Sequence, residues 1–252
     1  GEQEAEVANE YNYSVENKAY RSAVKIDKKL IKFQQFDEIS RLIGNLGAKA
    51  RAHKTKLLSA LLEAGFATTC EDGQYFFDDD HASAGAAYTT SQDNDLTSAA
   101  ATGTQPTELE AAIGIRACMD AMYGFKDDQG DPMTPPSQVP QSDFVCMVPP
   151  VYKTIFERVA RAESLTGPLG NELRGTFTVR VNPFLTGTDR FYFFYAGSNH
   201  KPLILQTSGG LELDDSMTGD EYFRSGNVNY SATWWGRAIY GQWRCAVGYI
   251  YS

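Results

Sequence analysis

An apolar repeat at three- and four-residue intervals, from Phe36 to just before Gly65, constrains the fold of this chain more than any other feature. The side chains in the repeat are Phe36, Ile39, Leu42, Ile43, Leu46, Ala50, Leu57, Leu58, Leu61 and Leu62. Such a stripe is typical of an amphipathic helix. Gly65 is a suitable residue to end it, and Gly44 and Gly47 weaken its middle. We therefore expect one long helix, in which the two glycines would allow a bend.

The residues before this helix favour extended structure. Two strands are predicted, one over residues 7–15 and one over residues 20–31, and both carry many polar side chains. A pair of strands this polar has little core of its own. We expect the pair to form an arm that packs against another surface.

Residues 67–105 hold few large apolar groups after Phe77. They predict a long loop or flap with one short hairpin at residues 73–77, and loops of this length are usually functional or ordered by a partner. A capping box over Thr107–Glu110 then begins a second helix, which ends at Gly124. We expect its buried stripe to contain Leu109, Ile113, Ala117 and Tyr123.

The second half of the chain is richer in strands. Residues 144–148 predict a short buried strand, which leads through two prolines into a third helix that reaches Ala160. Further strands are predicted at residues 176–181, 191–195, 203–206, 222–223, 229–235 and 238–251. The expected fold class is α+β, in one large domain or two interleaved ones.

The charges are unevenly distributed along this chain, whose formal net charge is −9 with 32 acidic and 23 basic residues. This balance argues against a surface that wraps DNA by neutralising its phosphates, but not against an inner face that lies near packed DNA. Acidic runs occur at residues 78–80, 127–131 and 212–215, whereas the N-terminal third holds a basic run. The run consists of Lys25, Lys28, Lys29, Lys32, Lys49, Arg51, Lys54 and Lys56. We interpret this asymmetry as one end of the protein that meets the acidic flank of a neighbouring molecule. The simpler alternative is that the basic residues lie on a helix face exposed to solvent.

The cysteines are isolated in the sequence, at Cys70, Cys118, Cys146 and Cys245. They form no Cys-x-x-Cys pair and no metal-ligand spacing, which predicts free buried thiols and a reducing compartment. No apolar run approaches the roughly 20 residues that span a bilayer. No secretory signal pattern is present either.

No motif for catalysis or cofactor binding is found: nucleophile elbow, phosphate loop, dinucleotide fingerprint and His-Glu-x-x-His are all missing. We therefore expect neither an enzyme nor a bound cofactor. His81 is the strongest candidate metal ligand, because it follows the carboxylates of residues 78–80. Adjacent side chains on an extended loop point apart, so we expect no metal site. His53 is expected to be exposed on the long helix, and His200 to lie in a turn.

Two dense aromatic clusters stand out, Phe191–Tyr195 and Trp234–Trp235. On half-exposed strands, such rings could bind a carbohydrate or a protein partner. A β core that is buried on both faces is the simpler interpretation, and we favour it.

A family resemblance is carried by segments spread in order over nearly the whole chain. They are residues 13–20, 23–27, 56–66, 71–77 with His81, 144–150, 182–183, 191–195 and 201–206. Together they resemble the Mu-like prophage major head subunit family, a family of bacteriophage major capsid proteins with the HK97-type fold. The resemblance implies a further N-terminal region ahead of the first strand pair, so we expect the chain to be a truncated, processed or partly ordered form.

The resemblance also implies a domain layout. Residues 1–32 would be an extended loop that reaches over an adjacent subunit. Residues 33–141 would form a peripheral domain with the flap and with a spine helix at 107–124. Residues 142–212 would form an axial domain at the capsomer centre, and residues 213–252 would be strands that return to the peripheral or axial domain.

The function that the resemblance implies is self-association, in hexamers and pentamers of an icosahedral-type virion shell that encloses phage DNA. Assembly would take place in the bacterial cytoplasm, with scaffolding, portal and decoration proteins as possible partners and without a membrane. A shell repeats one weak heterologous contact many times. We hypothesise that basic residues of one copy meet an acidic run of the next, at 78–80 or 212–215, and so set the register. The residues of this hypothesis are Lys25, Lys28, Lys29, Lys32, Asp78, Asp79 and Asp80.

Two other functions remain open at this point. An encapsulin-like bacterial nanocompartment shell would use the same architecture to enclose enzymes instead of DNA. A monomeric hydrolase or glycan-binding β domain would instead use the aromatic clusters and the Asp-Asp-Asp-His run at 78–81.

Overall fold

The computed structural model describes residues 15–33, 36–81, 90–100, 105–133, 143–165, 170–197, 199–215 and 227–252. The chain divides into two compact units. Unit 1 takes in Ser59–Ile204 and Tyr240–Ser252, and unit 2 takes in Ser14–Leu58 and Leu205–Ile239. Both helices and strands are present, as the predicted α+β class requires. The predicted strand at 222–223 lies outside the described residues, and so does the one at 7–15 except for its last residue, Val15.

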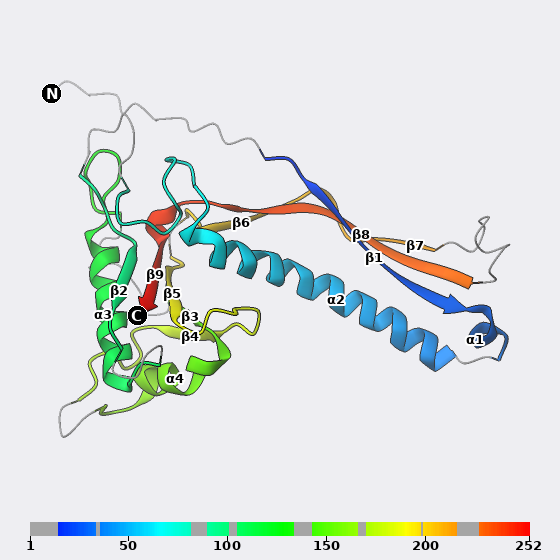
Figure 1. Cartoon of the computed structure of the whole chain (residues 1–252), viewed down its shortest axis with the longest axis horizontal. Coiled ribbons are helices and arrows are strands. Elements are labelled where there is room, and N and C mark those ends of the chain that lie inside the picture. The colour runs from blue at the N-terminus through cyan, green and yellow to red at the C-terminus, as the bar shows by residue number, and fades with distance from the viewer. Residues whose placement is uncertain are drawn as a thin grey trace. The chain divides into compact units, whose positions relative to one another are not determined.

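Unit 2 is built on a long antiparallel strand pair. β1 (Lys18–Asp27) pairs along its whole length with β8 (Asn227–Tyr240). On the other side of β8 lie β7 (Glu212–Asp215), which the sequence reasoning missed, and β6 (Leu203–Thr207) (Figure 1). The predicted strand at 203–206 is thereby confirmed.

The strand predicted to reach Ile31 ends at Asp27 instead. The short helix α1 (Lys28–Lys32) begins there, because the Asp27 carboxylate accepts a hydrogen bond from the backbone N of Lys29 at 2.9 Å. An aspartate in this position satisfies a backbone donor that a helix start leaves unpaired. The extended prediction was therefore wrong for the last residues of the segment.

The predicted long helix is confirmed as α2 (Phe36–Glu63). It runs as one continuous helix of 28 residues through Gly44 and Gly47. Gly65 follows in a short 3₁₀ turn, η1 (Ala64–Phe66), and has no left-handed backbone. A Cβ on Gly65 would lie 2.8 Å from the ring of Phe77, so this glycine serves close packing and not a left-handed helix end.

Unit 1 contains a five-stranded mixed sheet in the order β2-β9-β5-β3-β4. The strands are β2 (Asp95–Ser98), β3 (Phe144–Val148), β4 (Thr178–Val181), β5 (Arg190–Tyr195) and β9 (Ala246–Tyr251). β2 is parallel to β9 and β3 to β4, while β5 is antiparallel to both of its neighbours. β2 lies inside the segment that we expected to be a loop. A 3₁₀ turn, η5 (Trp243–Cys245), separates β8 from β9 and breaks the predicted strand 238–251 in two.

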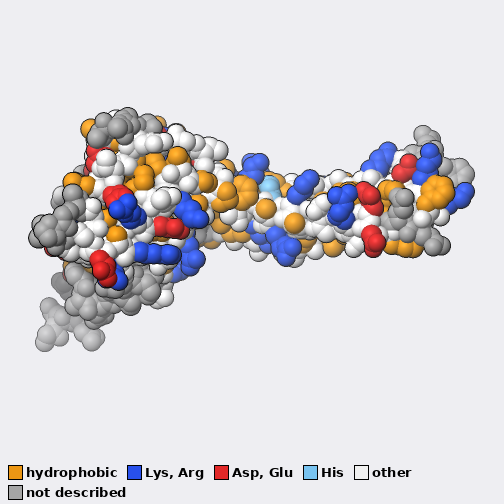
Figure 2. Space-filling view, turned by 90° about the horizontal axis from the view of Figure 1, so that it is seen from below, with side chains coloured by type: hydrophobic (Ala, Val, Ile, Leu, Met, Phe, Trp, Pro, Cys, Tyr) orange, Lys and Arg blue, Asp and Glu red, His pale blue; other side chains and the backbone are white. Residues whose placement is uncertain are grey.

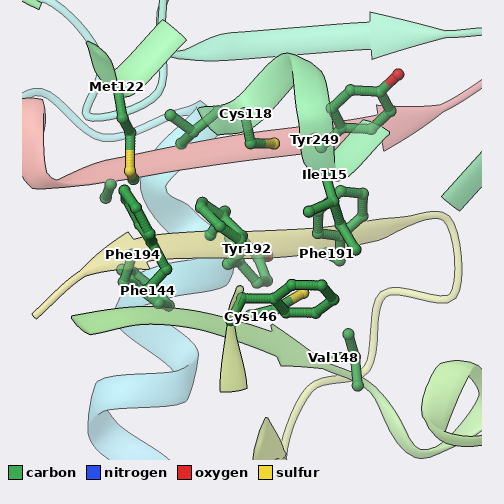
Figure 3. Close-up of a cluster of buried hydrophobic side chains, with 14 of the residues drawn as sticks. Ile115, Cys118, Met122, Phe144, Cys146, Val148, Phe191, Tyr192, Phe194 and Tyr249 are labelled. Atoms are coloured by element: carbon green, nitrogen blue, oxygen red, sulfur yellow. The ribbon is translucent and has the colours of Figure 1, made fainter. Parts of the chain in front are cut away.

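The hydrophobic core of unit 1 lies around β5. Phe191 to Phe194 are all buried, so the cluster is core, as the simpler interpretation held. Helix α3 (Glu108–Gly124) packs on this sheet, and Figure 3 shows Ile115, Cys118 and Met122 pointing from α3 toward the aromatic side chains. The helix α4 (Lys153–Arg161), after the prolines and η4 (Pro150–Tyr152), adds Phe156 and Val159 to the same core. Each large side chain buried in this way stabilises the fold by roughly 1.5–3 kcal/mol.

The buried face of α3 differs from the predicted one. The capping box is confirmed, because Thr107 and Glu110 each bond the other's backbone N. Leu109 and Ile113, however, are 52% and 57% exposed. The buried face instead combines small residues with Ile115, Met119 and Met122. One of its small residues is Gly114, where a Cβ would lie 3.1 Å from the Tyr249 ring. The close approach of α3 to β9 is therefore possible only on the face that carries this glycine.

Candidate functional site

The basic side chains of the hypothesised contact all belong to unit 2. Lys25 is exposed on β1, and Lys29 and Lys32 are exposed on α1. Lys28 is the first residue of α1. The structure therefore brings these four lysines to neighbouring positions at the junction of one strand and one short helix.

The acidic residues of the hypothesis belong to unit 1. Asp78 is half-buried, and its carboxylate accepts from the backbone N of Tyr75 at 3.1 Å. Asp79 and Asp80 are exposed, and they are held through their carbonyl oxygens, which accept from Ser91 Oγ at 3.2 Å and Gln74 Nε2 at 3.1 Å. Whether these carboxylates meet the lysines of a neighbouring copy stays a prediction.

A buried network lies directly behind this acidic run and is centred on His81, which has no exposed surface. Its Nδ1 lies 2.7 Å from Asp72 Oδ2, and its Nε2 lies 3.2 Å from Asn94 Oδ1. Its ring stacks on Trp243 of η5, with ring centroids 3.9 Å apart and planes 9° apart. His81 thus pairs with Asp72, nine residues earlier, while none of its hydrogen bonds goes to the adjacent residues 78–80.

Asn94 joins this network to two distant parts of unit 1. Its Nδ2 donates to the carbonyl oxygens of Phe76 at 2.9 Å and Ala246 at 3.2 Å. Its Oδ1 accepts from the backbone N of Asp78 at 2.9 Å. Because two carbonyls face Nδ2 and a backbone N–H faces Oδ1, the orientation of the amide is fixed. The Nε2 of His81 faces that same oxygen at 3.2 Å.

Cys70, Asp72 and His81 bring one sulfur, one oxygen and one nitrogen within 4.8 Å of one another, a set of atoms that could hold a metal ion. The spacing fits hydrogen bonds better. The Asp72–His81 distance of 2.7 Å is typical of a charge-assisted hydrogen bond, whereas two such ligands of one zinc ion lie roughly 3.3 Å apart. Cys70 Sγ also donates to Asp72 Oδ1 at 3.0 Å. We therefore assign the cluster a structural role.

The ionisation of the cluster agrees with that role. Burial and the neighbouring Asp72 raise the pKa of the Cys70 thiol far above its usual value, so Cys70 is not a nucleophile. Burial alone would raise the pKa of Asp72, but the hydrogen bonds from His81 and Cys70 hold it below its usual value. Asp72 is therefore ionised in the fold and accepts from both neighbours.

Two further carboxylates stand close to the acidic run. Burial, together with the negative charges of Asp93, Asp78 and Asp79, raises the pKa of Asp95 to about 6. Burial also raises the pKa of Asp93. This side of unit 1 therefore concentrates more negative charge than residues 78–80 alone, and the sequence reasoning did not include Asp93 or Asp95.

The structure of unit 2 tests two further expectations, one for His53 and one for the aromatic pair Trp234 and Trp235. His53 was expected to be exposed but is half-buried, because Tyr20 and Trp234 pack against its ring at centroid distances of 4.6 Å and 6.4 Å. Trp234 is buried and Trp235 is 38% exposed. Alternate residues of β8 point to opposite faces, so only one of the two tryptophans belongs to the core of this unit.

The fold described above is that of bacteriophage capsid proteins. A procapsid protein of bacteriophage JBD30 is 18% identical with a TM-score of 0.52, over 94% of this chain and 52% of the other. The capsid of cyanophage P-SCSP1u is 12% identical with a TM-score of 0.56, over 93% of this chain and 72% of the other. The mature capsid of bacteriophage PhiM1 is 10% identical with a TM-score of 0.56, over 93% of this chain and 71% of the other. The predicted HK97-type fold is thus confirmed.

The family resemblance is confirmed for the first part of the chain. The Mu-like prophage major head subunit gpT family matches residues 1–106. The Mu-like prophage FluMu major head subunit of Haemophilus influenzae is 41% identical over 71 residues, which are 28% of this chain and 23% of that protein. The match thus spans about a quarter of the length of this curated relative. Among the described residues, no helix combines the length and the apolar character needed to cross a bilayer.

Proposed function

We propose that this chain is a structural subunit of a bacteriophage head, which assembles with copies of itself into hexamers and pentamers of a DNA-enclosing shell. The observation that carries the proposal is the capsid fold of both units, combined with the family match over residues 1–106. The protein would then reside in the virion and interact with scaffolding, portal and decoration proteins. Its function would be structural and not catalytic.

The same proposal assigns roles to the elements. We take α2 as the long spine helix of the peripheral domain in place of 107–124, because α2 has 28 residues and α3 has 17. The arm that contains β1 precedes this helix in the sequence. The axial domain would be built on the β5-centred sheet of unit 1.

Sedimentation and negative-stain microscopy of the expressed protein test the proposal. We expect hexamers, pentamers or closed particles. A species that keeps the mass of a single 27.8 kDa chain under every assembly condition would contradict the proposal and favour the monomeric alternative. The nucleic acid and protein content of purified particles separates a phage head from a nanocompartment, since the latter would contain a cargo protein instead of DNA.

The hypothesised contact between copies has a test of its own. Replacing Lys28 and Lys29 with Glu should reduce particle yield while the subunit stays folded, because like charges would then face the acidic run. A matched control replaces the exposed Lys153 and Arg161 of α4 with Glu. Normal assembly of the Lys28/Lys29 variant, or an equal reduction in the control, would contradict the assigned contact.

A further inference from the structure

One stretch of α2 carries several positive charges and contains no acidic residue of its own. Between Ile39 and Leu62 the sequence contains Arg41, Lys49, Arg51, Lys54 and Lys56 but no Asp or Glu. Helices that are merely solvated usually mix both signs, because pairs of opposite charge three or four residues apart stabilise them. The absence of acids therefore needs another explanation.

Most of these cations point to solvent. Arg41, Lys49, Arg51 and Lys56 are exposed, whereas Lys54 lies over the Trp234 ring at 5.2 Å. Arg41 pairs with Glu38 at 2.8 Å. Lys49, Arg51 and Lys56 form no ion pair with any residue that the structure describes. Figure 2, which views unit 2 from the side of α2, shows Lys and Arg along the helix and acidic side chains only near one end.

The residues between these cations on the same face of α2 have small or polar side chains. At 100° per residue, Arg41, Lys49, Arg51 and Lys56 fall within the half of α2 that also exposes Asn45, Ala48, Ala52 and Thr55. The distance along the axis from Arg41 to Lys56 is about 22 Å at 1.5 Å per residue. The apolar side chains of α2 lie on the other half, where Leu46 is buried. No large apolar side chain therefore stands between the cations.

We propose that this face of α2, defined by Arg41, Lys49, Arg51 and Lys56, contacts the phosphate backbone of the DNA that the shell encloses. The inference rests on the proposed head function. A protein partner would need apolar or aromatic anchors at the centre of its interface, and this face offers only small and polar residues there. A row of cations beside small side chains suits a uniform polyanion. Such a polyanion can approach the helix closely and can be bound at any position along its length.

The negative net charge of the whole chain does not oppose this contact. The acids are concentrated elsewhere, and phosphate neutralisation depends on the local surface within a Debye length of about 10 Å. The contact of a single subunit would be weak. Repetition over the inner surface of a shell would make it effective without any sequence preference.

The test uses the unassembled subunit and a fluorescein-labelled 30-base-pair duplex, with binding followed by anisotropy between about 20 and 200 mM salt. Replacing Lys49, Arg51 and Lys56 with Gln should weaken binding at least tenfold at the lowest salt. It should also reduce the slope of log K against log salt by about 2.7, at about 0.9 for each phosphate that is no longer neutralised. The matched control replaces Lys153, Arg161 and Arg180 of unit 1, which are exposed and change the net charge equally.

The outcomes separate the inference from its premise. Unchanged binding in the α2 variant, or equally weakened binding in the control, would overturn the proposed DNA contact while the shell function stood. Negative-stain microscopy of each variant, after transfer to assembly conditions, should show normal particles. Failure of the α2 variant to form particles, with unchanged DNA affinity, would make this face a contact between subunits and overturn the proposal. If the triple variant unfolds, the Lys49/Lys56 double variant replaces it, with an expected slope change of about 1.8.

Discussion

Replacing Asn94 with Ala is the sharpest test of how unit 1 is held together. Asn94 is fully buried and makes hydrogen bonds to the Phe76 and Ala246 carbonyls, the Asp78 backbone N and His81 Nε2. The Asn94→Ala substitution would leave several of these groups in the interior without a partner. A buried polar group left unpaired costs about 1–3 kcal/mol. Some of the groups will find other partners, so we expect the unfolding free energy to fall by about 3–4 kcal/mol in total.

Urea unfolding followed by tryptophan fluorescence measures this decrease, and Trp243 is a suitable probe because it stacks on His81. Asn45→Ala is the matched control: it removes an exposed amide on α2 and should change stability by no more than about 0.5 kcal/mol. Asn94→Asp should destabilise at neutral pH as well, because a carboxylate would face two carbonyl oxygens. Equal unfolding free energies for Asn94→Ala and Asn45→Ala would refute the reasoning.

Three further predictions concern packing, thiols and pH. Gly241→Ala should cost at least about 1–3 kcal/mol in thermal or urea unfolding because its Cβ would collide with a backbone carbonyl, whereas Gly210→Ala, with open space around it, should be nearly neutral. The thiols of Cys118 and Cys146 are buried and their pKa is raised, so Ellman's reagent should label them only after denaturant is added; fast labelling of the native protein would contradict their placement. The folded pKa of Asp95, about 6, exceeds its unfolded value of 3.8, so its protonated form stabilises the fold and this contribution is lost as pH rises from about 4 through 6. Asp95→Asn should therefore gain stability over the unmodified protein across that range, by about 1 kcal/mol after allowance for solvent screening, and a constant difference in unfolding free energy from pH 4 to 7 would count against the assignment.

Features with a local origin could be predicted from the sequence. The apolar repeat of α2, the reciprocal bonds of Thr107 and Glu110, and the buried aromatic strand β5 each depend on residues close together in the chain. The resemblance of ordered segments then indicated the capsid fold. The buried face of α3 could not be read in this way, because Tyr249, more than 100 residues away, decides which face approaches the sheet.

The buried histidine network was missed for a related reason. His81 was compared with its immediate neighbours, the aspartates at 78–80, because contiguous charges attract attention in a sequence. Its partners are Asp72, Asn94 and Trp243, which are between 9 and 162 residues away. The only signal in the sequence was a pair of polar residues, Asp72 and Asn94, on either side of it. Nothing in their types or spacing distinguishes them from ordinary loop residues.

The network nevertheless bears on the candidate contact between copies, because it positions the acidic run. Asp78 is fixed by Asn94 through its backbone N, and Asp79 and Asp80 are fixed through their carbonyls. Backbone groups therefore hold the run in place, while the carboxylates of Asp79 and Asp80 form no ion pair with any described residue. Such a surface is ordered before a partner arrives, so docking does not have to immobilise the loop. Burial is the main reason why the pKa of Asp95 is raised, and the negative charges of Asp93, Asp78 and Asp79 raise it further. A partner's lysines would offset the effect of these charges, so assembly near pH 6 should release protons.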